Sequence, residues 1–308
     1  MNLQPTSDQN ALIDAIEQII AKPRELPRDG KHFAYSEELD AMLRGGGFLN
    51  VACEEGMGPL DAALVVETAS KSPFALETAA STLVAPMVIG EAVEGPVALM
   101  RDVRQAARFL PMAKAALVLD GDSAVLLDVR KLARAPVESL MAYPMGRFVE
   151  TPDLTRGRRL SPEQRDKLLM WWRVGIALEA SGAMQAAVHF TADYVTTRRQ
   201  FGRPLGSLQA IQHRLAECTT RAQGTRWLAR EAAWKGDAAS AALAATYAQR
   251  AIRPIVHDMH QFNGALGITL EHPLHYWTYR LTALQAELGG PSAQALAAAH
   301  ELWLRKSA

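Results

Sequence analysis

The feature that most constrains this chain is a long apolar pattern, from Leu168 to Val195, that no strong helix breaker interrupts. It follows Ser161-Pro162-Glu163-Gln164, which has the capping-box spacing and the early proline that mark a helix start. Helices joined by short connections favour antiparallel neighbours, so we predict a helix bundle over the C-terminal half. The remaining helical patterns of this half cover residues 207–235, 237–262, 274–288 and 292–304.

The first ninety or so residues also carry helical patterns. Thr6 to Gln9 has capping-box spacing, and apolar residues then recur at helical spacing until Pro23 and Pro27 break the pattern. Gly45-Gly46-Gly47 ends a second, short pattern. The further helices expected here cover residues 36–44, 60–69 and 75–88.

The pattern changes between Gly95 and Phe148, where short apolar runs are separated by turn residues such as Asp120-Gly121-Asp122. We expect a few strands there, at 97–100, 115–119 and 124–129. The chain is therefore predicted to be mostly α with a small β domain. The expected parts are an N-terminal helical domain (1–94), a middle β domain (95–150) and a C-terminal helical bundle (151–308).

Composition excludes several classes of protein. Among 308 residues, 49% are hydrophobic, so the chain can bury a sizeable core. The chain has 33 Lys and Arg residues and 33 Asp and Glu residues. Its formal net charge is therefore zero, and no net electrostatic attraction to nucleic acid or an anionic membrane is expected. Cys53 and Cys218 support neither a disulfide framework nor a zinc site. With no signal-peptide pattern and no membrane-spanning apolar run, we expect a cytoplasmic protein without nucleic-acid or membrane partners.

The most informative polar segment is the arginine motif, residues 198–205. Arg198 offers a planar fork for two phosphate oxygens, Gln200 offers an amide donor, and Phe201 offers a flat apolar face. This set suits the phosphates and ring of a dinucleotide. From composition alone, an ordinary helix connection containing Arg, Gly and Pro is the alternative.

The string from Tyr194 to Glu217 closely resembles the C-terminal helical domain of acyl-CoA dehydrogenases. The resemblance rests on Arg198-x-Gln200-Phe201-Gly202-Arg203-Pro204-Leu205 and on Leu208-Gln209-Ala210-Ile211-Gln212-His213-Arg214-Leu215-Ala216-Glu217. A second segment, the glycine motif (residues 261–267), is similar to that family's Gln-x-x-Gly-Gly-x-Gly. It reads Gln261-Phe262-Asn263-Gly264-Ala265-Leu266-Gly267 and is followed by Glu271-His272-Pro273, which resembles the family's acidic-x-Pro segment.

The resemblance implies a shared cofactor. In such enzymes FAD lies across a subunit interface, and these two segments hold the ADP half of the flavin that belongs to the adjacent chain. Ala265 replaces the family's second glycine here, and no Thr-Glu-Pro/Gly-Ser-Asp-like stretch, which cradles the isoalloxazine ring, is present. By this resemblance the FAD-binding residues are Arg198, Gln200, Phe201, Gln209, Gln261 and Gly264. The implied fold is an N-terminal helical domain, a reduced β domain and a C-terminal four-helix bundle.

The catalytic carboxylate expected of this family is missing from its usual places. The reaction resembled removes an α-proton and transfers a β-hydride to flavin, so one positioned Asp or Glu is required. The corresponding positions hold Leu288 or Gly289 in one case and Trp172 in the other. Glu287 is adjacent and is the remaining candidate, with a solvated helix charge as its alternative role. Trp171 and Trp172 are expected to fill core or interface volume.

Four histidines invite a metal hypothesis, which we do not favour. His257 with His260 and His272 with His275 have helical i, i+3 spacing, but no metallohydrolase-type acidic motif accompanies them. Hydrogen bonding at a surface or interface is the expected role, and no metal site is predicted.

The sequence resembles the smaller, non-catalytic subunit of heteromeric bacterial acyl-CoA dehydrogenases that act on steroid-derived CoA thioesters. The implied partner is a second acyl-CoA dehydrogenase-like subunit, in an α2β2 heterotetramer, that supplies the base and acts on the acyl-CoA substrate. Two alternatives stay open. One is a self-sufficient homo-oligomeric dehydrogenase that uses Glu287, and the other is a structural partner that binds no flavin.

Overall fold

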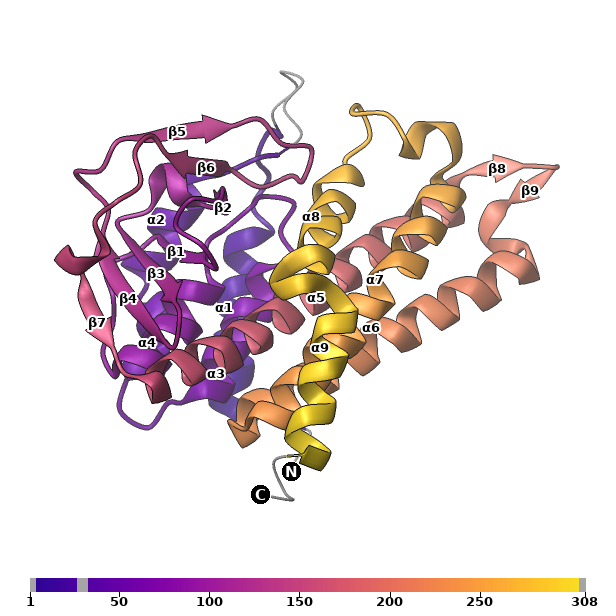
Figure 1. Ribbon diagram of the computed structural model, residues 1–308. Coiled ribbons are helices and arrows are strands. Elements are labelled where there is room, and N and C mark those ends of the chain that lie inside the picture. Colours follow the sequence, from indigo (N-terminus) through magenta and orange to yellow (C-terminus); the bar gives the residue numbers. More distant parts are fainter. Residues whose placement is uncertain (1–3, 27–32, 305–308) are drawn as a thin grey trace.

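The computed structural model describes residues 4–26 and 33–304. The N-terminal helices and the strands lie together against one part of the helix bundle, whereas the hairpin of β8 (Arg199–Gln200) and β9 (Arg203–Pro204) projects at the far end of the bundle (Figure 1). Pro27 and the outermost residues of the predicted terminal domains, 1–3 and 305–308, lie outside this part of the chain.

The helices predicted in the N-terminal part are confirmed, with one difference. Thr6 caps the first helix, because Gln9 N donates to Thr6 Oγ1 at 3.2 Å and Thr6 N donates to Gln9 Oε1 at 3.1 Å. The pattern predicted as one helix over 75–88 instead forms a π-helical turn, Ala79–Val84, followed by a short α-helix. Pro86, which has no amide N–H to donate, lies just after that turn. The helices are α1 (Ser7–Ile20), α2 (Glu37–Gly45), α3 (Pro59–Ala69) and α4 (Ala85–Ile89), with a 3₁₀ turn at Phe48–Cys53.

Two small sheets form the middle of the chain. In the first, β1 (Val97–Met100) is parallel to β3 (Ala115–Asp120), which forms a hairpin with β4 (Ser123–Asp128). The predicted turn is confirmed there, with Gly121 at φ 58°. β7 (Arg158–Leu160) pairs with β4 and lies beyond residue 150, where the β domain was expected to end. The second sheet has the order β2 (Ala107–Arg108), β6 (Met145–Phe148) and β5 (Arg134–Val137).

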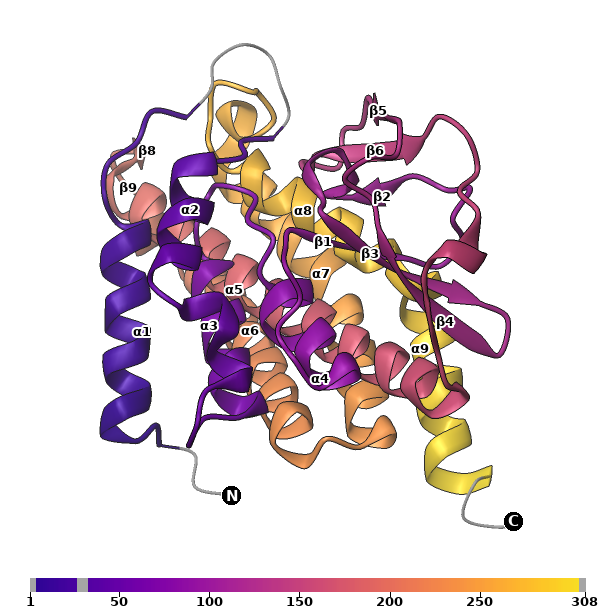
Figure 2. The same cartoon turned by 90° about the vertical axis from the view of Figure 1, so that its left-hand side faces the viewer.

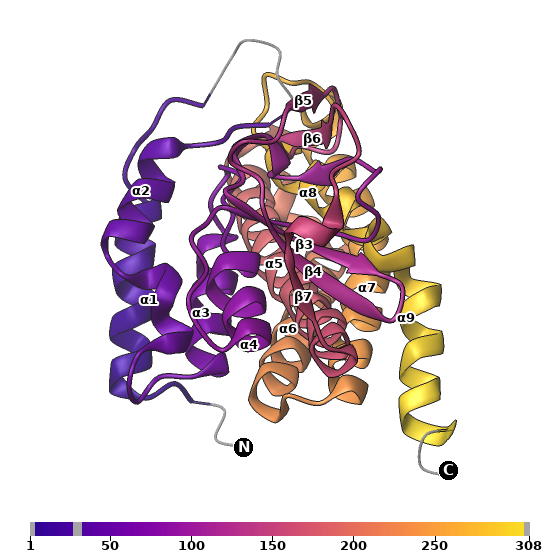
Figure 3. The same ribbon diagram turned by 60° about the vertical axis from the view of Figure 1, so that its left-hand side comes forward.

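The C-terminal helices form the predicted bundle around one central helix. α5 (Pro162–Thr197) is 36 residues long, begins at the predicted Ser161 cap and is buried on all sides through its middle. Figures 2 and 3 show the N-terminal helices on one side of it and α9 on the other. Within the described ranges, no helix combines the length and apolar character needed to cross a membrane. The other helices are α6 (Gln209–Lys235), α7 (Ala238–Gly267), α8 (His275–Ala286) and α9 (Gly290–Ala299), with a final π-helical turn at His300–Leu304.

A buried carboxylate joins α3 to the bundle. Glu67 is 1% exposed and accepts hydrogen bonds from Arg230 Nε at 2.7 Å and from Ser181 Oγ at 2.6 Å. The two helix backbones approach closely beside it, because a Cβ on Gly182 would lie 2.1 Å from the carbonyl oxygen of Glu67. Position 182 therefore accepts only glycine, and the charge of Glu67 is balanced by Arg230.

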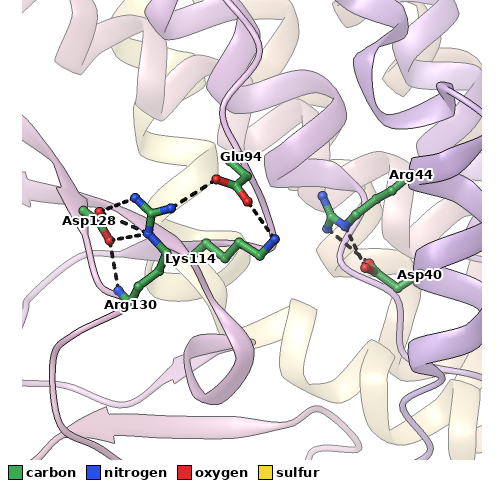
Figure 4. Close-up of polar contacts among 6 residues, drawn as sticks. All are labelled: Asp40, Arg44, Glu94, Lys114, Asp128 and Arg130. Atoms are coloured by element: carbon green, nitrogen blue, oxygen red, sulfur yellow. Dashed lines mark hydrogen bonds and ion pairs between the residues drawn. The ribbon is translucent and has the colours of Figure 1, made fainter.

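One group of ion pairs lies on the surface, around Glu94. Figure 4 shows Arg130 bonded to Asp128 at the end of β4 and to Glu94, which also accepts from Lys114 Nζ at 2.8 Å. These residues tie the segment before β1 to the sheet. Because they are exposed, they contribute much less to stability than the buried Glu67 contacts.

We predict that Glu67→Ala lowers the free energy of unfolding by about 3–5 kcal/mol, because it leaves the Arg230 charge buried without a partner. Urea unfolding followed by circular dichroism measures the loss. Glu94→Ala, which removes two exposed ion pairs, is the control and should change stability by only a small fraction of that amount. Equal losses in the two variants would contradict this assignment.

Candidate functional site

The arginine motif forms the end of α5 and a projecting hairpin. Arg198 caps α5, its N–H donating to Tyr194 O at 2.9 Å, and β8 and β9 follow. Phe201 and Gly202 occupy the two turn positions with φ of 54° and 77°. A positive φ is unusual for phenylalanine, and the turn leaves its ring 83% exposed. Gln209 is the exposed first residue of α6.

The glycine motif forms the last turns of α7. Gln261 lies on the exposed side of the helix, and Gly264 kinks it with φ 59° and ψ −146°. That backbone conformation is available to glycine at little cost. A Cβ at Gly264 would have no neighbour within 4 Å, so the backbone there faces open space.

Contacts between α5 and α7 bring the two motifs to the same end of the bundle. Asn263 Nδ2 donates to Thr191 Oγ1 at 3.0 Å, and both residues are buried. In the connection after α7, the His272 ring packs edge-on against Phe190 and Tyr194, with centroids 5.1 Å and 5.7 Å away. Two segments about sixty residues apart in sequence therefore face solvent together (Figure 1).

The residues at this end fit the nucleotide part of a dinucleotide. The side chains of Arg198, Gln200 and Gln261 are exposed and make no hydrogen bond or ion pair with other residues that the structure describes. A free guanidinium and free amides suit phosphate and ribose oxygens, and the exposed Phe201 ring suits stacking against a flat heterocycle. This surface can bind such a ligand without breaking an internal contact.

The positions expected for a catalytic carboxylate lie elsewhere, between the second sheet and the bundle. Leu288 and Trp172 line the same cavity there, together with Glu287. The Glu287 side chain is 17% exposed, so the alternative role as a solvated helix charge is wrong. Its carboxylate accepts from Trp172 Nε1 at 3.0 Å and from Arg108 Nε.

Arg108 completes a buried ion triad with Glu179 and Glu287. Its Nη1 and Nη2 donate to the Glu179 carboxylate at 3.2 Å and 2.9 Å, and its guanidinium lies 4.4 Å from the centre of the Tyr143 ring. Burial opposes the charge on Arg108, but the two carboxylates outweigh it and hold the pKa of Arg108 well above its ordinary value. Burial raises the pKa of Glu179, and Arg108 opposes that rise.

The triad fills most of the space beside it. The cavity lined by Glu77, Arg108, Glu179 and Glu287 has a volume of about 20 Å³, enough for about one water molecule. A substrate carbon has no room next to the Glu287 carboxylate on this side. Glu287 is held by two donors and is poorly placed to remove a proton.

Sequence reasoning missed Arg108 and Glu179. Glu179 carried a usable signal, because it is a carboxylate inside the long apolar pattern of α5, and such a group needs a buried cation. Arg108 had no such signal, since its strand has only two residues.

The histidines make hydrogen bonds within the protein. His260 bonds through Nδ1 to Gly267 O at 2.7 Å and through Nε2 to Thr278 Oγ1 at 3.0 Å, and His275 Nδ1 bonds to His272 O at 2.8 Å. In the chain as described, no group of three or more His, Cys, Asp or Glu side chains could hold a metal ion.

Comparison with known proteins relates the bundle to one family. Residues 164–300 match the family model of the acyl-CoA dehydrogenase C-terminal domain. The acyl-CoA dehydrogenase IpdE2 of Mycobacterium tuberculosis is 31% identical over 176 residues, which are 54% of this chain and 55% of that protein. The chain thus matches about half the length of this curated relative.

Solved structures share the fold over nearly the whole chain. The ChsE4-ChsE5 complex from Mycobacterium tuberculosis has a TM-score of 0.83 at 20% identity, covering 98% of this chain and 99% of that one. A glycine-to-alanine variant of the steroid ACAD Tcur3481-Tcur3483 also has a TM-score of 0.83, at 22% identity, covering 98% and 99%. At these identities the likeness shows the fold alone.

We predict that the connection carrying His272 weakens in acid. Burial lowers the pKa of His272 below its ordinary 6.5, and His260 and His275 add to the effect. Between the pKa of His272 in the folded protein and about 6.5, the unfolded chain therefore binds more protons than the folded one. The contribution of His272 to stability is fully present above about pH 6.5 and is lost as the pH decreases through this window. His272→Phe should show a smaller loss of unfolding free energy between pH 7.5 and 5.5.

Urea unfolding at both pH values measures this difference. His189→Gln, which changes an 81% exposed histidine on α5, is the matched control and should behave as the wild type. An unchanged pH dependence in His272→Phe would contradict the prediction.

Proposed function

We propose that this chain, whose residues 164–300 match the family model of the acyl-CoA dehydrogenase C-terminal domain, is a member of that family of flavin-dependent oxidoreductases and the smaller, non-catalytic subunit of a heteromeric enzyme. The partner in this proposal is a second acyl-CoA dehydrogenase-like subunit, in an α2β2 heterotetramer. The pair would convert an acyl-CoA thioester to its α,β-unsaturated product in the cytoplasm.

The hydrogen bonding of the Glu287 carboxylate is the observation that carries this proposal. It is the acidic residue next to the expected base position, and its carboxylate is already bonded to Arg108 and Trp172. The nucleotide-facing side chains of Arg198 and Gln261, by contrast, are exposed and free of internal contacts. A chain with this combination can contribute to binding a flavin but depends on another chain for proton abstraction.

The residues of this chain would bind and orient the ADP half of FAD. Arg198 would form paired hydrogen bonds to pyrophosphate oxygens, Gln200 and Gln261 would donate from their amides, and Phe201 would cover an apolar ring face. The open backbone at Gly264 permits close approach. FAD, when bound, supplies the hydride acceptor for the substrate's β carbon.

The substrate class in this proposal is a steroid-derived CoA ester, from a cholesterol-type or bile-acid side chain. Support comes from the likeness to the steroid ACAD Tcur3481-Tcur3483, whose fold this chain shares from end to end. The ChsE4-ChsE5 complex and the Tcur3481-Tcur3483 steroid ACAD are each named for two components, which also supports a heteromeric assembly.

We predict that Arg198→Ala reduces FAD retention by the co-purified pair by roughly tenfold or more, because it removes a charge-assisted contact to phosphate. Flavin absorbance after repeated dilution and concentration measures retention. Arg221→Ala, which removes another exposed arginine on α6, is the control and should retain flavin normally.

Two results would decide against the proposal. Unchanged flavin content in Arg198→Ala would favour a structural partner that contacts no flavin. A yellow protein that oxidises acyl-CoA when this chain is purified alone would favour a self-sufficient homo-oligomer.

Glu287→Gln gives a separate prediction for the pair. We expect kcat to stay within about twofold of the wild type, whereas the melting temperature of this chain should fall because a neutral amide replaces the charged hydrogen-bond partner of Arg108 Nε. Stopped-flow oxidation of an acyl-CoA and thermal unfolding measure the two effects. Loss of a general base lowers rates by about 10²–10⁴, so a decrease of that size would identify Glu287 as the base.

A further inference from the structure

A second cavity, of about 290 Å³, lies outside the ion triad, between the second sheet and the end of α8. Its walls are mainly apolar. The lining residues include Leu99, Met100, Met141, Met145, Ala283 and Trp172. Methionine side chains are flexible and polarisable, so Met141 and Met145 let the wall adapt to apolar ligands of different shape, whereas Met100 is buried in the core.

Of the charged side chains that line this cavity, some have an ion-pair partner among the described residues and one does not. Asp102 is paired with Arg104, whose Nη2 lies 2.7 Å from the carboxylate, and Glu287 is paired with Arg108. Arg101 also lines the cavity, but its guanidinium makes no hydrogen bond or ion pair with the residues that the structure describes. A Cβ on Gly289 would lie 3.9 Å from Arg101 Nη1, which places this free cation beside the connection between α8 and α9.

We propose that this cavity binds a small apolar carboxylate, with the hydrocarbon part among the methionines and the carboxylate on Arg101. The apolar walls supply the larger part of the binding free energy by removing the hydrocarbon from water. Arg101 supplies the preference for an anion, since its planar fork matches a carboxylate and the acidic groups of the lining, Asp102 and Glu287, are each already bonded to an arginine. An amine would find no unpaired carboxylate among these lining residues.

No chemical step is part of this proposal. The ligand occupies the cavity that both expected base positions, Trp172 and Leu288, line in this chain. Every residue of the cavity lining belongs to this chain, so ligand binding here can be tested separately from the binding of FAD.

Isothermal titration of the purified full chain with sodium octanoate and with 1-octanol tests the proposal. We expect octanoate to bind at one site, and octanol to bind roughly tenfold or more weakly because it lacks the charge. Arg101→Gln should weaken octanoate binding by roughly tenfold and leave octanol binding unchanged. Arg147→Gln, which removes an exposed arginine of β6 outside the cavity lining, is the charge-matched control and should bind octanoate normally.

A second variant tests the apolar part. Ala283→Phe places a ring in the cavity and should abolish binding of both compounds. Because Arg101 is exposed, its substitution leaves folding intact and keeps the test decisive if Ala283→Phe misfolds. No octanoate binding to the wild type, equal binding of octanoate and octanol, or an equal loss in Arg101→Gln and Arg147→Gln would each overturn the proposal.

Discussion

The interaction on which the arrangement of this protein depends is the ion triad of Arg108, Glu179 and Glu287. Arg108 comes from β2, Glu179 from the middle of α5, and Glu287 from the residue after α8, so one buried guanidinium joins a small sheet to two helices. A buried charge is costly unless it is paired, and here neither the sheet nor the bundle can move away without exposing an unpaired ion. The triad therefore fixes how the β strands sit against the bundle.

The two ends of the molecule consequently have different chemical capacities. At the far end of the bundle, Arg198 at the end of α5, Gln200 in the hairpin and Gln261 near the end of α7 face solvent. Asn263 and Thr191 hold the two helices together there. Beside the sheets, the groups that could perform proton transfer are used to bind one another. Nucleotide binding needs exposed, oriented donors, whereas a general base needs a carboxylate free to accept a proton. Exposed donors lie at the far end of the bundle, whereas the Glu287 carboxylate beside the sheets is already bonded to Arg108 and Trp172.

Most of the helices could be predicted from sequence because their signals are local. The caps at Thr6 and Ser161 are confirmed as hydrogen bonds, and the apolar pattern of α5 gave its length. The strands β2, β5, β6 and β7 could not be predicted, since segments as short as Ala107–Arg108 carry no periodicity and exist through their partners. The ion triad was missed because Arg108 lies 71 residues from Glu179 and 179 residues from Glu287 in sequence, and only the fold brings them together. The six residues implied by resemblance stay a prediction, although the structure places both motifs at one end of the bundle.

The apolar residue at position 288 and the ion triad are physically linked. Leu288 lines the same cavity as Arg108 and Glu287. A carboxylate at 288 would add a third acid near one guanidinium, and the excess negative charge would raise the pKa of the acids or force the side chain out of the cavity. Arg101 could pair with such an acid, but it would then no longer be available to bind another anion in the cavity. Leucine at 288 therefore adds no further negative charge beside the two carboxylates that already share Arg108.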